Sequence, residues 1–348
     1  MIPVQNIYYM LSYAFQALQA QNYKDLATEN FHNTAELCAA ILDKGISVQL
    51  KRGLGRDYLP KSESLSTLQG KLNISESIKT QTLLKKQMIC TYDEFSTNTQ
   101  FNQIIKSTLL LLLKANITNT RKKSLRNLLL FFSDVSEIDL RFVNWSQHYN
   151  RSNQSYQMLI GICYLIYNGL LQTQNNGTTK IMDFFDEQRM CHLYEKFLLE
   201  YYRKEHPELS ANASQIAWQL DDSENQLLPK MQTDIMLSQR NNILIIDAKY
   251  YSHMTQQQYG TNTLHSNNLY QIFTYVKNKE FELKDCEHTV SGMLLYAQTD
   301  ENIIPNNTYQ MSGNQIAVRA LNLNQDFSGI AEDLDSIIEK HFFYHSGE

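Results

Sequence analysis

The spacing of hydrophobic residues changes along the chain and divides it into regions of different expected structure. Residues 4–19 carry apolar side chains three and four positions apart, which places one apolar stripe along a helix. The same spacing predicts a second helix at residues 34–42 and further helices within residues 101–115, 124–132 and 158–171. We therefore expect a helical layer over most of the N-terminal half.

One stretch of the N-terminal half has a different pattern, because short β-like runs alternate with glycine and proline. The three runs are residues 46–50, 72–74 and 88–92. The stretch is also basic, since residues 44–90 hold nine Lys and Arg against three acids, a net charge of +6. The sequence predicts a mixed helical N-terminal domain at residues 1–175, with a small, basic, strand-rich insert at about residues 44–92.

After a polar run at residues 172–179, strands and helices are expected to alternate. The expected elements are a helix at 183–203, strands at 215–220, 231–237 and 242–250, a helix at 263–277, strands at 290–296 and 316–321, and a helix at 330–342. This order predicts an α/β domain at residues 176–348, in which helices flank both sides of a mixed sheet.

The composition indicates a folded chain that is long enough for two domains. Its 348 residues include 43% hydrophobic and 19% charged side chains. The net charge of −5 argues against binding to DNA through overall charge, so any nucleic-acid contact has to be local. The five cysteines are scattered, which favours neither disulfides nor a zinc site. Because there is no secretory leader and no apolar run of membrane-spanning length, we expect a cytoplasmic protein without a membrane role.

The strongest chemical signal is an apolar run that ends in Asp247, Ala248 and Lys249. Residues 242–250 read Asn-Ile-Leu-Ile-Ile-Asp-Ala-Lys-Tyr, which is typical of a buried strand. Asp247 and Lys249 are two positions apart, so a strand places both side chains on one face. Asp234 lies in the preceding β-like run, and a short polar turn would pair the two runs as a hairpin. The two aspartates can then face each other.

These groups suit the metal-dependent hydrolysis of a phosphodiester. Mg²⁺ prefers hard oxygen ligands, and it can polarise the scissile phosphate and lower the pKa of an attacking water. Asp234 and Asp247 would bind the metal through their carboxylates, and the Ala248 carbonyl is a candidate further ligand. Lys249 would orient the water or stabilise negative charge on the phosphate.

The same residues also have simpler interpretations. An Asp-x-Lys triplet occurs by chance roughly once in a chain of this length, and it can form an ordinary ion pair at a sheet edge. The preceding acidic strand favours the nuclease interpretation. Glu195 on the helix before the strands is a candidate further carboxylate, although such a residue is more often a solvated helix side chain. Gln271 on the helix after them could reach the site or a DNA phosphate, and a structural role is at least as common.

Other reaction types have little support. The chain has no GxxxxGK[ST] loop, so it should not hydrolyse nucleoside triphosphates itself, and it has no GxSxG, HExxH or GxGxxG motif. The nine histidines do not gather at ligand spacing. His341 and His345 are four positions apart, but no acid or cysteine stands at matching spacing, so we interpret them as surface residues.

The two acidic runs resemble the PD-(D/E)XK nuclease superfamily. Other segments narrow the resemblance to the McrC family, the nuclease subunits of McrBC modified-cytosine restriction systems, and they cover almost the whole chain. The matching segments are residues 2–4, 6–14, 52–54, 57–58, 91–93, 104–109, 228–231, 233–235, 246–251, 265–266 and 268–271. The chain departs from the superfamily pattern twice, because no proline directly precedes Asp234 and the middle acid is Asp247 where Glu is commoner. Both variants still supply oxygen ligands.

The resemblance implies that the chain functions as a subunit of a larger complex. A separate AAA+ GTPase hexamer, McrB, would bind GTP, read methylated cytosine and translocate DNA. The N-terminal part of this chain would dock into that ring and stimulate its GTPase, with Lys51, Arg52 and Arg56 as docking candidates. The C-terminal part would cut double-stranded methylated DNA with Mg²⁺, and cutting both strands implies a dimer of this chain in the full complex. A solvated surface or direct DNA contact is an alternative role for the basic insert.

Two further functions fit the sequence. The chain could be a GTPase-activating scaffold with a degenerate nuclease centre, which predicts GTPase stimulation without metal-dependent cleavage. It could also be a partner-independent repair nuclease, which predicts cleavage without any nucleotide-hydrolysing partner.

Overall fold

A computed structural model gives the structure of the chain. It describes residues 2–15, 18, 23, 26, 29, 31–151, 153–175, 187–222, 227–251, 255–258, 261–298 and 304–343. The chain forms two compact units, one of Met1–His32 with Phe185–Glu348 and the other of Asn33–Phe184. We call them the sheet unit and the helical unit. The expected division at residue 175 differs from these units, because the first 32 residues belong with the C-terminal part.

Helix α1 (Val4–Ala14) joins the sheet unit through contacts that are distant in sequence. The Tyr13 hydroxyl donates to Glu205 Oε1 at 2.8 Å, on helix α7 (Glu187–Glu205). Asn6 Nδ2 donates to the carbonyls of Leu323 and Gln325, each at 2.8 Å. Helical periodicity identified the buried stripe of α1, but it carries no information on which unit covers that stripe.

The helical unit confirms the helices expected in the N-terminal half. They are α2 (Thr34–Arg52), α4 (Gln100–Leu113), α5 (Asn119–Leu129) and α6 (Tyr156–Asn175), with 3₁₀ turns at Leu130–Phe132 and Leu140–Phe142. The β-like interpretation of residues 46–50 is wrong, because α2 continues through them. Ile46 stands four residues after Leu42, and both side chains are buried, so Ile46 extends the apolar stripe of the helix.

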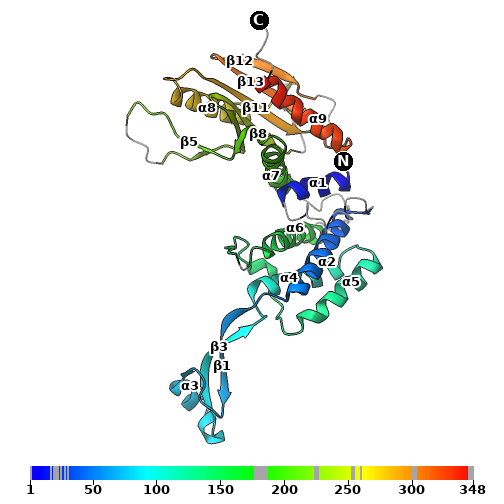
Figure 1. Ribbon diagram of the computed structural model, residues 1–348, viewed down its shortest axis with the longest axis vertical. Coiled ribbons are helices and arrows are strands. Elements are labelled where there is room, and N and C mark those ends of the chain that lie inside the picture. The colour runs from blue at the N-terminus through cyan, green and yellow to red at the C-terminus, as the bar shows by residue number, and fades with distance from the viewer. Residues whose placement is uncertain are drawn as a thin grey trace. The chain divides into compact units, whose positions relative to one another are not determined.

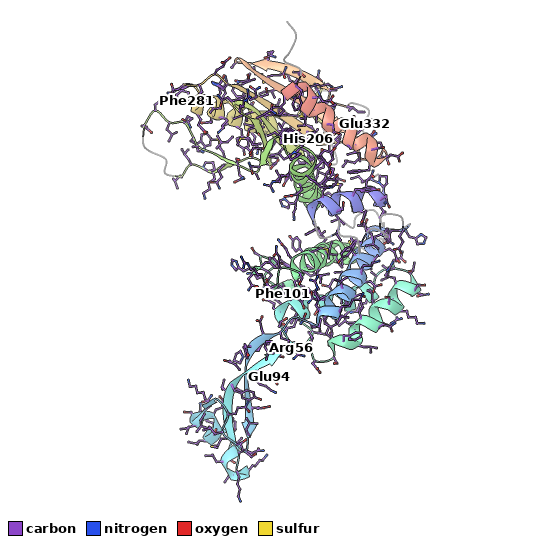
Figure 2. All side chains as sticks on the ribbon, in the orientation of Figure 1. Arg56, Glu94, Phe101, His206, Phe281 and Glu332 are labelled. Carbon is purple, nitrogen blue, oxygen red and sulfur yellow. The ribbon has the colours of Figure 1, made fainter. Side chains whose placement is uncertain are left out.

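A strand-rich insert extends from the helical unit, as expected, and we call it the β-module (residues 57–96). It contains β1 (Asp57–Leu65), β2 (Lys71–Leu72), α3 (Ile74–Lys79), a 3₁₀ turn (Thr82–Lys85) and β3 (Met88–Ser96). The strands are antiparallel in the order β1-β3-β2, and Asp57 pairs with Ser96. Arg56 and Glu94 mark the end at which the module joins the helices (Figure 2). The insert begins later than expected because residues 44–52 belong to α2.

The sheet unit is built on a mixed six-stranded sheet, which confirms the expected fold class at this level (Figure 1). Its strands, in spatial order, are β12 (Asn307–Met311), β13 (Asn314–Leu321), β11 (Thr289–Ala297), β8 (Asn242–Lys249), β7 (Ile235–Gln239) and β4 (Ser210–Asn212). The pairs β13–β11 and β11–β8 are parallel, and the other pairs are antiparallel.

Helices cover both faces of this sheet. Helix α8 (Ser266–Glu282) packs on the face that carries Ile243 and Ile245. It approaches very closely at Gly292, where an added Cβ would lie 2.8 Å from side-chain atoms of Ile272 and Val276. By strand alternation, Leu244 and Ile246 point to the opposite face, where α7 packs. Helix α9 (Phe327–Ile338), which continues as a π-helical turn (Glu339–Phe343), contacts α7 in turn.

Smaller elements differ from the expected ones. The expected strand at 231–237 is two strands, β6 (Met231–Gln232) and β7, because the chain bends at Thr233 and Asp234. Strand β6 pairs with β5 (Gln215–Ile216) in a separate two-stranded ladder, and β9 (Thr255–Gln258) pairs with β10 (Thr261–Leu264). The expected polar loop at 172–179 is wrong for residues 172–175, because α6 continues to Asn175. Residues 176–179, together with residues 183–186, lie outside the described residues. Among the described helices, none has the length and hydrophobicity needed to cross a membrane.

Candidate functional site

The hairpin of β7 and β8 brings Asp234 beside the strand that carries Asp247. Ile235 pairs with Ile246, so Asp234 stands one residue before β7, at the position opposite Asp247. The carboxylate of Asp234 accepts a hydrogen bond from the Ala248 backbone N–H at 2.9 Å. The chain bends at Thr233 and Asp234, just before β7. The buried Thr233 stabilises this bend, because its hydroxyl donates to the Ser214 carbonyl at 3.0 Å. The interruption of the expected strand therefore positions an acidic side chain.

Asp247 is the most buried acid of the site, with 1% of its surface exposed. Its Oδ2 lies 2.8 Å from the Lys249 ammonium in an ion pair. Neither carboxylate oxygen accepts a well-formed hydrogen bond from the part of the chain that the structure describes. Buried carboxylates are stable only when their oxygens are satisfied, so this arrangement favours the binding of a further cation.

Burial and mutual charge perturb all three groups. Burial is the largest cause that raises the pKa of Asp234, and the charges of Asp247 and Glu195 add to it. Against the opposing effects of Lys249 and the Ala248 N–H, the pKa is raised to about 8. Burial also raises the pKa of Asp247, although Lys249 opposes that shift. For Lys249, burial lowers the pKa, but the two aspartates outweigh it and the pKa is raised overall. Lys249 therefore remains an ammonium group at neutral pH.

Glu195 on α7 lies close enough to influence both aspartates. Its charge raises the pKa of Asp234 and of Asp247. Its Oε1 accepts from the Cys191 thiol at 3.0 Å, and its Oε2 lies 3.2 Å from Nδ1 of His192. The structure therefore places Glu195 at the border of the site, with its side chain 27% exposed.

The oxygen groups fit a hard cation such as Mg²⁺. The described residues contain no group of three or more His, Cys, Asp or Glu side chains that could hold a metal ion. The candidate ligands are therefore the carboxylates of Asp234 and Asp247, with the Ala248 carbonyl and water completing the set. Two carboxylates plus water are usual for Mg²⁺, which keeps part of its hydration shell in proteins.

Lys249 is held by a relay of hydrogen bonds through α8. Its ammonium donates to Gln271 Oε1 at 3.4 Å, and Gln271 Nε2 donates to the Tyr275 hydroxyl at 3.0 Å. The Tyr275 hydroxyl donates to the Gln232 carbonyl at 3.1 Å, two residues before Asp234. The sequence pointed to Gln271 but not to Tyr275. Their four-residue spacing, which places both on one face of a helix, is the signal that could have found it.

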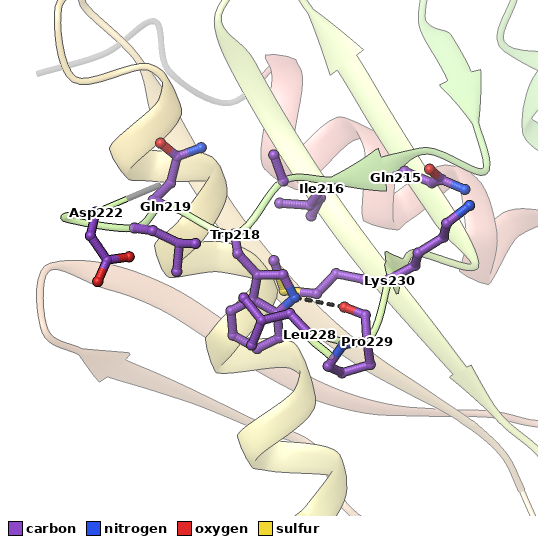
Figure 3. Close-up of a pocket in the computed structure, with 11 residues that line it drawn as sticks. Gln215, Ile216, Trp218, Gln219, Asp222, Leu228, Pro229 and Lys230 are labelled. Atoms are coloured by element: carbon purple, nitrogen blue, oxygen red, sulfur yellow. Dashed lines mark hydrogen bonds between the residues drawn. The ribbon is translucent and has the colours of Figure 1, made fainter. Parts of the chain in front are cut away.

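A surface hollow lies on the segments that carry β5 and β6 (Figure 3). Trp218 and Leu228 line it, and Trp218 Nε1 donates to the Pro229 carbonyl at 2.6 Å between the two segments. The hollow contains none of the site residues Asp234, Asp247 and Lys249. The hollow is therefore separate from the candidate site.

The other sequence candidates lie elsewhere in the chain. Lys51, Arg52 and Arg56 are exposed in the helical unit. The first two are in the last turn of α2, where a cation also stabilises the helix dipole, and Arg56 lies over the Phe95 ring at 5.9 Å. His341, expected at the surface, is half-buried in the π-helical turn that continues α9, where its Nδ1 lies 2.9 Å from the Ile337 carbonyl one turn earlier. His345 lies outside the described residues.

Comparisons with known proteins agree with one another. The family described as "McrBC 5-methylcytosine restriction system component" matches residues 4–297. The type IV methyl-directed restriction enzyme EcoKMcrBC of Escherichia coli (strain K12) is 31% identical over 350 residues, which cover 98% of each chain. A solved half-complex from a tetradecameric assembly of Thermococcus gammatolerans McrB AAA+ hexamers with bound McrC is similar with a TM-score of 0.51 and 17% identity. That match covers 97% of this chain and 76% of the other, and it shows a shared fold.

Proposed function

Because the chain belongs to the McrBC 5-methylcytosine restriction system family as a McrC component, we propose that it is the DNA-cutting subunit of a GTP-dependent restriction complex. The observation that carries this proposal is the buried Asp247 carboxylate, which is paired with the Lys249 ammonium and lies opposite a second acid, Asp234. A purely structural ion pair needs no second buried acid. A phosphodiester-cleaving centre of the PD-(D/E)XK type needs a second acid, because two carboxylates bind its metal ion.

Each residue then has a defined task. Asp234 and Asp247, with the Ala248 carbonyl, would hold Mg²⁺, which when bound supplies a Lewis acid for the phosphate and lowers the pKa of a water. Lys249 remains protonated and can stabilise the negative charge that develops on the phosphate. Gln271 and Tyr275 position Lys249 through the hydrogen-bond relay, and Glu195 adds negative charge at the border of the site.

The helical unit would bind the motor of the complex. The solved relative contains McrB AAA+ hexamers with bound McrC, so the proposed partner is a GTP-binding AAA+ hexamer that delivers double-stranded DNA with methylated cytosine. The β-module, with Lys51, Arg52 and Arg56 near its base, would dock to this ring and stimulate its GTPase. Large exposed apolar side chains suit a docking role, and the module carries Tyr58 at 71% and Leu84 at 81% exposure. Two copies of the chain would cut the two strands.

The test is cleavage of methylated DNA by the complex with its partner, GTP and Mg²⁺. Asp247→Ala should lower the cleavage rate by about a hundredfold or more while GTPase stimulation is retained, because only the metal-binding site is changed. Asp285→Ala, at an exposed aspartate, is the matched control.

Gln271→Ala should lower the cleavage rate less than Asp247→Ala does, because Lys249 keeps its ion pair with Asp247. Full cleavage by the Asp247 variant would exclude the proposed site, and GTPase stimulation without any cleavage by the wild type would indicate a scaffold.

A further inference from the structure

Helix α5 has a cationic outer face that belongs neither to the proposed catalytic site nor to the proposed docking surface. We propose that this face binds the sugar-phosphate backbone of double-stranded DNA without reading its sequence. The inference rests on the proposed function, because it assumes that the complex handles DNA.

The outer face forms one row along the helix. Lys122, Arg126 and Leu130 stand four positions apart and therefore stack on one side, with Lys123 beside them. Lys123 and Arg126 are exposed, and Leu130, just after the helix, is 75% exposed. Residues 119–132 contain no acid. None of the three cations forms an ion pair with another residue that the structure describes.

The inner face of α5 fixes the direction in which this row points. Arg121, the fourth cation of the helix, turns inward and pairs with Asp43 at 3.2 Å and with Glu36 at 3.7 Å. Asp43 also accepts from the Ser124 hydroxyl at 2.7 Å, and Glu36 accepts from the Thr118 N–H and hydroxyl at 2.8 Å each.

These bonds, together with the buried Leu125 and Leu128, hold α5 on α2. The outer cations are therefore presented by a helix whose rotation is already set, which lowers the entropic cost of binding.

The spacing of the cations suits a continuous polyanion. Lys122 and Arg126 are about 6 Å apart along the helix axis. Double-stranded DNA carries one negative charge per about 1.7 Å of its axis, so the row meets phosphates in any register. A protein partner would have to supply acids at three matching positions. Because the whole chain has a net charge of −5, a local surplus of three cations is not explained by overall composition.

The experiment measures binding of the full-length chain to unmodified duplex DNA, by fluorescence anisotropy in EDTA over a series of salt concentrations. The variant combines Lys122→Gln, Lys123→Gln and Arg126→Gln. Each lost phosphate contact lowers the slope of log K against log salt by about 0.9, so the expected loss is about 2 to 3, with at least a tenfold weaker affinity at low salt. The control combines Arg240→Gln, Lys284→Gln and Lys340→Gln, which removes the same charge from exposed positions of the sheet unit.

A slope and affinity equal to those of the control would overturn the proposal. So would unchanged DNA binding combined with lost GTPase stimulation of the AAA+ partner, since the face would then dock a protein. Thermal melting shows whether the variant is folded, and the single substitutions repeat the test if it is not. Asp247→Ala separates the two proposals, because it should lower cleavage by about a hundredfold or more while leaving the α5 cations in place. Cleavage that survives Asp247→Ala would reject the nuclease site and leave the α5 result unaffected.

Discussion

The two aspartates of the site show how much a buried charge depends on its neighbours. Asp234 lies just before β7, opposite Asp247 on β8. Burial opposes the charge of both carboxylates, and the charge of Asp247 raises the pKa of Asp234 further. Lys249 compensates for one negative charge only. The pair therefore titrates as one coupled system, and a divalent cation would replace the shared proton.

Asp234→Asn should therefore stabilise the metal-free protein at alkaline pH. The pKa of Asp234 is raised to about 8 in the folded chain, and an unfolded aspartate has a pKa of about 3.9. The folded state thus binds more protons between these values, and the free energy of unfolding falls as pH rises from about 4 to 8. Asparagine cannot ionise, yet its Oδ1 can still accept from the Ala248 N–H.

We expect a gain of about 1–3 kcal/mol at pH 8 in EDTA and a clearly smaller gain at pH 5, measured by urea denaturation. Mg²⁺ should reduce the difference by stabilising the wild type alone. Asp285→Asn is the control, and an equal gain at both pH values would contradict the coupling.

At the scale of single residues, the sequence predicted which groups meet but not how they are supported. Asp247 and Lys249 share a face because strands alternate with a period of two. Asp234 reaches them through a bend that hydrogen bonds from Thr233 to Ser214 stabilise, 19 residues apart in sequence. Tyr275 was missed because its bond to the Gln232 carbonyl is tertiary, and helix periodicity alone assigns it only to the core.

At the scale of elements, periodicity located the helices and strands but not the places where two of them approach most closely. Helix α8 lies against β11 at Gly292, and a methyl group there would meet Ile272 and Val276 at 2.8 Å. Nothing in the local pattern of β11 distinguishes this glycine from one in a loop. Residues 46–50 were misassigned for a related reason, since β-branched residues fit a helix when its buried stripe requires them.

Gly292→Ala should push α8 away from the sheet and destabilise the sheet unit by about 1–3 kcal/mol, as overpacked cores do. Urea denaturation followed by circular dichroism measures the loss. Gly329→Ala in α9 is the matched control, because its added methyl group meets only the end of the flexible Gln325 side chain. Equal stability of the two variants would show that α8 has room to adjust.

At the scale of the whole molecule, the β-module is attached at one point. Asp57 and Ser96 pair directly, so the module begins and ends at neighbouring positions. Its base is fixed from the helical unit, because Asn102 donates to the carbonyls of Gly55 and Thr97, at 2.9 and 2.8 Å, and accepts from the Tyr156 hydroxyl at 2.8 Å. These contacts do not use the residues of the module itself.

Replacing residues 57–96 with a short glycine-serine linker should leave the remaining chain folded. The linker has to span only the distance between two paired strand residues, about 5 Å. We expect a nearly unchanged thermal transition for the rest of the chain and a loss of GTPase stimulation, measured with the AAA+ partner. Stimulation that persists after the excision would move the docking surface to another part of the helical unit.

The assignment of α1 to the sheet unit has a consequence for the order in which the chain folds. Domains generally fold as units as they leave the ribosome, and the helical unit is complete in sequence by residue 184. Helix α1 precedes the helical unit in the sequence, but the carbonyls of Leu323 and Gln325 that hold Asn6 follow that unit by more than 130 residues. The helical unit, which is proposed to bind the AAA+ partner, can therefore fold before the sheet unit, which is complete only after residue 325 has been synthesised.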